Sequence, residues 1–178
     1  MGTKFSTRIW VSVVGIASIF LGSKGYADTV ISVADFGLKP DTRENAVAYV
    51  QKAIEACRGK EPVTLVFPEG RYDFWPQYAH EKNYYETNTY DVFPKRLAML
   101  FEGLHNITVD GNGSQFVMHD RIQPITVENC DGVTLKNFSI DWDIPLTAQA
   151  RVTKVGSDFF EIEINVLESP YIIEDGKL

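Results

Sequence analysis

The spacing of short apolar runs between Leu97 and Trp142 constrains the fold of this chain more than any other feature. Asn, Asp and Gly separate these runs, and no helical pattern occurs among them. Their first inward-facing residues would lie nine, nine, eight and seven residues apart, at Ile107, Phe116, Ile125, Val133 and Ile140. Three consecutive steps therefore span twenty-six residues from Ile107 to Val133, and twenty-four residues from Phe116 to Ile140. Such regularity predicts three short strands per coil, each stacked on its counterpart one coil earlier, as in a parallel β-helix.

The turns between the runs are rich in asparagine, which tolerates left-handed backbone. The residues concerned are Asn106, Asn112, Asn129 and Asn137. Three of them also begin glycosylation triplets, but repeated coils need turns in any case, so turn chemistry is the favoured interpretation. An antiparallel sandwich would give similar strand spacing, yet only the pair Asn112 and Gly113 resembles a tight hairpin turn. The β-helix is therefore preferred.

One amphipathic helix is predicted ahead of these runs. Four residues recur at helical spacing and would form its buried face: Val47, Val50, Ile54 and Cys57. Asp41 stands at the expected N-cap, Glu44 would complete a capping box, and Gly59 follows the end, so the helix is predicted over residues 42–58. Laid across the open end of a β-helix, it would cover unpaired strand edges. The predicted fold is mainly β with an amino-terminal capping helix.

Residues 1–27 have the pattern of a secretory signal peptide. Lys4 and Arg8 precede the apolar run Ile9–Leu21, which is too short to cross a bilayer as a helix, and Ala27 precedes the expected cleavage point. The chain has 17 basic and 24 acidic residues, a formal net charge of -7. An exported protein, periplasmic or secreted, is expected, with no membrane span after cleavage. Its negative charge argues against nucleic acid as a partner.

Two aspartates form the first candidate site. Asp141 and Asp143 flank Trp142 at the end of a predicted strand, so their side chains would share one face at roughly 6.5–7 Å between α-carbons. Trp142 would then point to the opposite face and pack in the core. An inverting glycoside hydrolase needs an acid and a base on opposite sides of the scissile bond, about 6.5–9.5 Å apart. Two neighbours on one strand fit substrate binding better than that catalytic pair.

The segment "VMHDRIQP" supplies the second candidate site. His119 and Arg121 could reach a groove that binds sugars, and they are predicted to bind substrate together with Asp141 and Asp143. The alternative is a solvated corner in which Asp120 and Arg121 pair at the surface. No histidine forms a recognisable ligand spacing, so neither a metal nor a cofactor is expected.

Two further features are less decisive. Cys57 and Cys130 could pair in an oxidising compartment, although two separate buried thiols are favoured. Residues 72–96 form an aromatic-rich segment whose Phe74 and Trp75 are expected to pack against the strands. Its tyrosines could pack there as well or form a glycan-binding wall; they include Tyr84, Tyr85 and Tyr90.

Longer motifs bring a family resemblance. The order "VADFG", "AIEAC" and "LVFPEGRYDF" resembles the amino-terminal cap of pectate-lyase-like right-handed β-helix proteins. The stretches "YDFWPQ", "PKRLAMLFEGLHNITVDGNGSQFVMHDRIQPITVENCDGVTLKNFSIDWDIPLTAQA" and "YIIEDGKL" resemble the amino-terminal part of glycoside hydrolase family 110. This resemblance covers nearly all of the chain from Val30 to Leu178. It implies an exo-acting α-1,3-galactosidase that removes terminal galactose from glycans of the blood group B type, with inversion and without a metal.

The resemblance also affects the expected limits of the chain. Family members are several times longer, so the catalytic aspartates are expected beyond Leu178, with Asp141 and Asp143 as weaker candidates. Residues 151–178 alternate around "GSD" as an antiparallel hairpin does, and family 110 enzymes resemble β-helices with inserted β-barrel modules. We therefore predict a signal peptide at 1–27, a cap with the first coils at 28–150, and the start of an inserted module at 151–178. The chain would be a truncated product, inactive alone, and the full-length protein could be a homo-oligomer.

Two other functions remain open from the sequence. One is a different polysaccharide-active β-helix, such as a polygalacturonase or a lyase. Its uronate substrates call for basic residues, of which the strands offer few beyond Arg121 and Lys136. The other is a non-catalytic carbohydrate-binding β-helix, which would lack opposed carboxylates.

Overall fold

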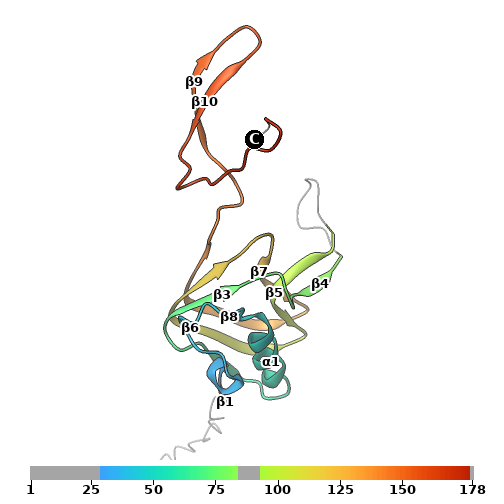
Figure 1. The fold of residues 1–178 in the computed structure, drawn as a ribbon. Helices are drawn as coiled ribbons and strands as arrows, with labels where there is room; N and C mark the ends of the chain where they lie inside the picture. Colours follow the sequence, from blue (N-terminus) through green and yellow to red (C-terminus); the bar gives the residue numbers. More distant parts are fainter. Residues whose placement is uncertain (1–28, 84–92, 177–178) are drawn as a thin grey trace, which may run out of the picture.

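The structure, a computed structural model, describes residues 29–83 and 93–176 (Figure 1). The predicted signal peptide and the tyrosines Tyr84, Tyr85 and Tyr90 lie outside the described residues. Within them no helix is long and apolar enough to cross a membrane. The elements follow in the order β1 (Thr29–Ser32), a 3-10 helix η1 (Val33–Phe36), α1 (Val47–Cys57), β2 (Val63–Val66), β3 (Arg71–Phe74), β4 (His80–Lys82), β5 (Lys95–Glu102), β6 (His105–Met118), β7 (Gln123–Glu128), β8 (Asp131–Trp142), β9 (Ala150–Val155) and β10 (Phe160–Ile164).

Parallel strands dominate the architecture. One sheet runs β1-β2-β6-β3 with β8 also paired to β6, and every pair in it is parallel. In a second sheet β5 pairs with β7 in parallel and with β4 in antiparallel orientation. The protein is therefore mainly β with parallel sheets and, among the described residues, a single α-helix.

The pairing of β6 with β8 confirms the repeat that the sequence predicts. Ile107 pairs with Val133, and Phe116 pairs with Ile140. The register shifts between Asp110 and Ser114, where the interval falls from twenty-six to twenty-four residues. The turn asparagines have left-handed backbone as expected, with φ between 49° and 60°, at Asn106, Asn112, Asn129 and Asn137.

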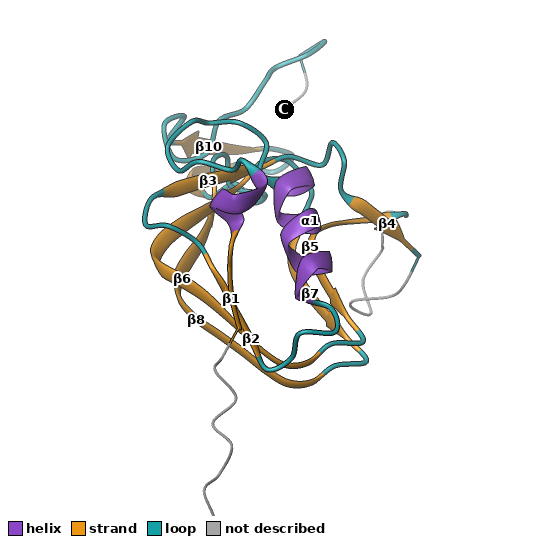
Figure 2. Ribbon diagram, turned by 90° about the horizontal axis from the view of Figure 1, so that it is seen from below, coloured by secondary structure: helices purple, strands orange, loops and turns teal. Residues whose placement is uncertain are grey.

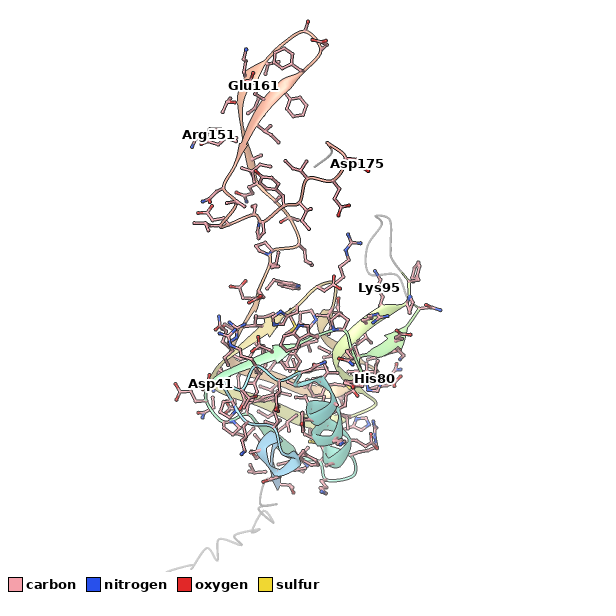
Figure 3. All side chains as sticks on the ribbon, viewed as in Figure 1. Asp41, His80, Lys95, Arg151, Glu161 and Asp175 are labelled. Atoms are coloured by element: carbon pink, nitrogen blue, oxygen red, sulfur yellow. The ribbon has the colours of Figure 1, made fainter. Side chains whose placement is uncertain are left out.

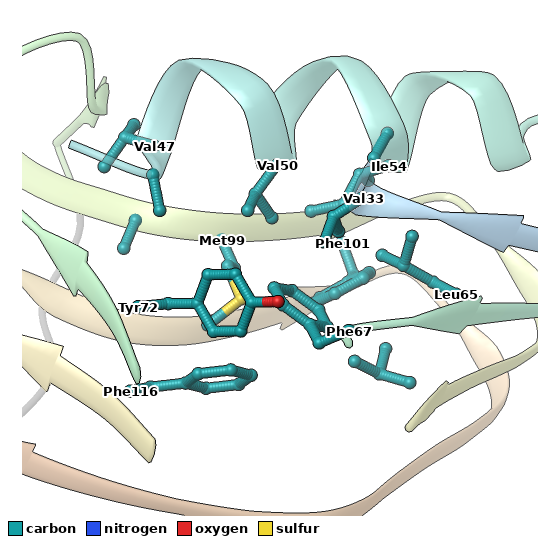
Figure 4. Packing of buried hydrophobic residues seen from close by; sticks show 14 of the residues in the cluster. Val33, Val47, Val50, Ile54, Leu65, Phe67, Tyr72, Met99, Phe101 and Phe116 are labelled. Carbon is teal, nitrogen blue, oxygen red and sulfur yellow. The ribbon is translucent and has the colours of Figure 1, made fainter. Parts of the chain in front are cut away.

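The buried core lies between the two sheets and helix α1 (Figure 2). Figure 4 shows Val47, Val50 and Ile54 on the face of α1 that is turned toward the aromatic side chains of the strands. Phe116 is the centre of an aromatic group, with ring centroids 4.8 Å from Phe67 and 6.1 Å from Tyr72. Burial of these large rings removes much apolar surface from water and so stabilises the core.

The predicted start of the helix is wrong, although its end is right. Helix α1 begins at Val47, and Ala46 at its N-cap makes no side-chain capping bond. Asp41 instead has a left-handed φ of 62° and accepts a hydrogen bond from the backbone N–H of Arg71 at 2.9 Å. A contact with a strand thirty residues away therefore outweighs the local capping pattern. The capping box occurs elsewhere, between Ser32 and Asp35 of η1.

Asn45 performs the role at the helix start that the sequence assigned to Asp41. Its Oδ1 accepts from the N–H groups of Val47 and Trp75, both at 3.2 Å, and its Nδ2 donates to the carbonyl of Gln77 at 2.9 Å. Asn45→Ala is expected to lower the free energy of unfolding by about 1–2 kcal/mol, as loss of a helix-capping residue does. Glu44→Ala, the change that should matter if the predicted capping box existed, should cost less than about 0.5 kcal/mol. Urea unfolding of both variants tests this, and equal losses would contradict it.

The carboxyl-terminal part forms the predicted hairpin. Strands β9 and β10 pair in antiparallel orientation around a turn in which Gly156 N–H donates to the carbonyl of Phe159 at 2.7 Å. The hairpin projects away from the sheets (Figure 1). Whether residues 151–178 begin a separate module stays a prediction.

Both cysteines are free. Cys57 is fully buried in α1, and burial raises the pKa of its thiol to about 11. Cys130 is partly buried and packs against the core, and its Sγ donates to the carbonyl of Phe101 at 3.3 Å. They are two separate thiols, which the sequence favoured over a disulfide.

Candidate functional site

An ionic cluster lies where β3, β6 and β8 end side by side. In β3, Tyr72 and Phe74 are buried in the core, so the alternating residues Arg71 and Asp73 face away from it. Asp73 is nevertheless fully buried, with a side-chain exposure of 0%. The chain leading into α1 runs beside it, because Asn45 and Asp73 form a parallel bridge and Ala46 N–H donates to the Asp73 carbonyl at 2.8 Å. This part of the molecule is shown with all side chains in Figure 3.

Asp73 is held by two strong donors. Arg71 binds its carboxylate in a fork, with Nε at 3.1 and 3.0 Å from the two oxygens and Nη2 at 2.6 Å from Oδ1. His119 Nε2 lies 2.8 Å from the same Oδ1. Burial alone would raise the pKa of Asp73, but the hydrogen bonds from Arg71 and His119 outweigh it and hold the pKa below its usual range. The carboxylate is therefore ionised and fixed in place.

His119 follows β6, the middle one of three neighbouring parallel strands, β3, β6 and β8. Phe74, Met118 and Trp142 are in register on β3, β6 and β8, so Trp75, His119 and Asp143 follow at equivalent positions. The indole of Trp75 stacks on the imidazole, with centroids 3.9 Å apart and planes inclined by 6°. Toward β8, His119 Nδ1 lies 3.7 Å from Asp143 Oδ2.

Asp143 is the exposed member of the cluster. Its side chain is 44% accessible, against 15% for His119. Arg71 Nη2 reaches its Oδ1 at 3.3 Å, so one guanidinium contacts both aspartates. The backbone N–H of Asp143 donates to the carbonyl of Met118 at 3.0 Å, which continues the strand pairing beyond β8.

Of the four predicted substrate-binding residues, the structure brings together only His119 and Asp143. Asp141 is exposed, and its Oδ1 accepts from the backbone N–H of Trp142 at 2.8 Å. Arg121 is exposed, and no ion pair joins it to Asp120, although both belong to the described part of the chain. Trp142 packs against the core, as predicted.

Arg121 lines a separate open cavity of about 500 Å³ next to the cluster. Trp142 and Leu146 give this cavity an apolar wall, and Asp120 and Gln123 add polar groups. Trp142 Nε1 is buried without a hydrogen-bond partner among the described residues. Of the four predicted residues, His119 and Asp143 therefore belong to the ionic cluster, Arg121 lines the neighbouring cavity, and Asp141 belongs to neither.

The two carboxylates of the cluster do not form an opposed acid and base. Both contact Arg71 Nη2, so their Oδ1 atoms are at most about 6 Å apart, less than the roughly 6.5–9.5 Å of inverting hydrolases. Asp73 is also buried and paired on the same side as Asp143. Among the described residues, no group of three or more His, Cys, Asp or Glu side chains could hold a metal ion.

The sequence did not point to Arg71 and Asp73. In "RYDF" two charges alternate with two aromatic residues on a short strand, a pattern that places charges on the outer face. That pattern was a usable signal for a charged pair. It could not reveal that the side chain of Asp73 is fully buried.

The fold and the cluster together define a mainly β protein with parallel sheets, whose polar side chains converge at one end of the strands. No family model matches the chain. It is 60% identical to alpha-1,3-galactosidase B of Bacteroides thetaiotaomicron over 152 residues, 85% of this chain and 25% of the relative. It is 36% identical to alpha-1,3-galactosidase A of Shewanella woodyi over 148 residues, 83% of this chain and 24% of the relative.

A third relative, alpha-1,3-galactosidase B of Phocaeicola vulgatus, is 35% identical over 159 residues, 87% of this chain and 25% of that protein. The chain is therefore homologous to α-1,3-galactosidases A and B, and the resemblance seen in the sequence is confirmed. It spans about a quarter of the length of these curated relatives.

Proposed function

We propose that this chain is part of an enzyme that removes terminal α-1,3-linked galactose from glycans. The observation that carries the proposal is the 60% identity with an alpha-1,3-galactosidase over 152 residues. The chain corresponds to about a quarter of such an enzyme, and its two paired aspartates are not placed as acid and base. We therefore infer that the catalytic carboxylates lie outside this chain and that the reaction proceeds with inversion, as the family resemblance implies.

We further propose that the strands form a right-handed parallel β-helix capped by α1. The parallel pairing of β6 with β8 and of β5 with β7 supports this, because each joins residues about one predicted coil apart. Right-handed crossovers are strongly favoured between parallel strands. Export through a signal peptide at residues 1–27, and an inserted module beginning near residue 151, belong to the same proposal.

Within this enzyme we assign a substrate-binding role to His119 and Asp143. Asp143 is half exposed, His119 is partly exposed beside it, and stacking on Trp75 holds the imidazole in place. Imidazole and carboxylate are common hydrogen-bonding partners for hydroxyl groups. Arg121 and Asp141 are further candidates, through the neighbouring cavity and the exposed end of β8.

Galactose release by the full-length protein is the direct test of the function. A trisaccharide with a terminal α-1,3-linked galactose should be cleaved, and NMR of the first-formed sugar should show the inverted anomer. The corresponding α-1,4-linked trisaccharide serves as control and should be cleaved much more slowly. Absence of galactose release from the α-1,3-linked substrate would refute the proposal.

Asp143→Asn in the full-length protein should weaken substrate binding more than turnover. Loss of a charged hydrogen bond costs about 1.5–3 kcal/mol, so KM should rise about 10-fold to 100-fold, with kcat changed less than about threefold. Asp131→Asn, at the opposite end of β8, is the matched control and should leave both constants unchanged. A fall in kcat alone would instead make Asp143 a catalytic residue.

A further inference from the structure

We propose that Asp73 is a positioning residue, which aligns His119 and Asp143 to receive the hydroxyl groups of the terminal sugar. The inference rests on the proposed function, since it concerns the same site. Asp73 itself is fully buried and cannot reach a substrate. Any influence on binding must therefore pass through the side chains that it holds.

The first effect of Asp73 is on the imidazole. In a neutral histidine one ring nitrogen donates and the other accepts, and the hydrogen bond at one nitrogen sets the state of the other. Because the ionised Asp73 can only accept, His119 Nε2 carries the hydrogen that it donates across 2.8 Å. Nδ1 is then left as an acceptor on the side of Asp143.

Stacking removes the remaining freedom of the ring. Trp75 lies nearly parallel to the imidazole at 3.9 Å, so the ring cannot turn about its bond to the backbone without losing that contact. Two independent contacts therefore fix one atom, Nδ1, in position. A histidine that served only to fill space would not need both.

The second effect of Asp73 is on Asp143 and acts through Arg71. The guanidinium that is forked on Asp73 also contacts Asp143 Oδ1 at 3.3 Å. The hydrogen bond to Asp73 is the largest cause of the raised pKa of Arg71, which keeps this side chain charged. Asp73 thus fixes the guanidinium, and the guanidinium orients a carboxylate that is otherwise half exposed.

The result is a pair of acceptors that cannot satisfy each other. His119 Nδ1 and Asp143 Oδ2 are 3.7 Å apart and, with the imidazole neutral, neither has a hydrogen to share. A sugar hydroxyl provides the missing donor. Such a pair favours a ligand with adjacent hydroxyl groups and disfavours an anionic one, because a second negative charge would meet Asp143.

Stability alone does not require this ion pair. Replacing both partners of a buried pair with apolar residues of similar volume is often neutral or stabilising, whereas removing one partner is costly. The double variant Arg71→Met with Asp73→Leu should therefore fold with a stability close to that of the wild type. Its His119 would have lost the acceptor at Nε2.

Two measurements test the proposal. In the unmodified 178-residue chain, nitrogen-15 NMR at alkaline pH, where the imidazole is neutral, should show His119 with hydrogen on Nε2 and none on Nδ1, assigned by comparison with His119→Gln. In the double variant of the full-length protein, KM for the α-1,3-linked trisaccharide should rise at least 10-fold, with kcat changed much less. Hydrogen on Nδ1 in the neutral ring, or a wild-type KM in a folded double variant, would overturn the proposal.

The NMR result also separates this inference from the proposed function. It does not depend on catalysis, so the expected spectrum in a protein that releases no galactose would refute the galactosidase and leave the alignment by Asp73 standing. Galactose release with hydrogen on Nδ1 would do the opposite. If the double variant fails to fold, the NMR measurement on the unmodified chain still decides.

Discussion

Replacing Phe116 with alanine is expected to lower the free energy of unfolding by about 3–5 kcal/mol. The side chain is fully buried, and its ring contacts four others, with centroids 4.8 Å from Phe67, 4.8 Å from Phe138, 5.6 Å from Phe74 and 6.1 Å from Tyr72. The four neighbouring rings come from three separate segments of the chain, since Tyr72 and Phe74 are both on β3. They cannot all move inward to fill the space, so the cavity persists and its cost adds to the lost burial.

Phe160→Ala provides a matched control for this prediction. Phe160 lies on β10 and is 66% exposed, so the same change should cost less than about 0.5 kcal/mol. Urea unfolding followed by circular dichroism gives both values on the same chain. A loss for Phe160→Ala as large as that for Phe116→Ala would mean that the aromatic group is not the centre of the folding unit.

Strand pairing could be predicted from the sequence because the apolar residues of one strand recur at a regular interval in the strand that pairs with it. Ile107 and Val133 occupy the same place in successive repeats, and the structure pairs them. Asn137 illustrates why the turns were also predictable, since its left-handed φ of 60° is one that asparagine tolerates. Both features depend on local residue preferences together with a period, and a sequence displays both.

The helix start and half of the cluster could not be predicted, for a common reason. Asp41 makes its hydrogen bond to Arg71, and Asp73 makes contacts with His119 and Arg71 at the end of the strands. His119 is forty-six residues from Asp73 along the chain, and only the pairing of β3 with β6 brings them together. A local pattern identifies a charged residue, but burial and partners depend on the completed fold.

Asp73→Asn is expected to lower the free energy of unfolding at neutral pH by about 3 kcal/mol, near the lower end for breaking a buried ion pair. The amide keeps the shape of the side chain but not its charge. Arg71 would lose its fork and stay only 21% exposed, although Asp143 would still contact it. The amide oxygen could still accept from one donor, and these remaining contacts explain why a larger loss is not expected.

The effect of Asp73→Asn should also depend on pH in a defined direction. Because the pKa of Asp73 is lowered in the folded state, its contribution is fully present above the ordinary value of 3.8 and is lost as pH falls through the lowered pKa. Urea unfolding at pH 7, 5 and 3 should therefore show a constant difference between wild type and variant at the first two values and a smaller one at pH 3. Asp131→Asn, on the exposed start of β8, serves as control and should differ little from wild type at pH 7 and 5. A difference between wild type and Asp73→Asn that stays the same down to pH 2 would show that the charge of Asp73 does not stabilise the folded chain.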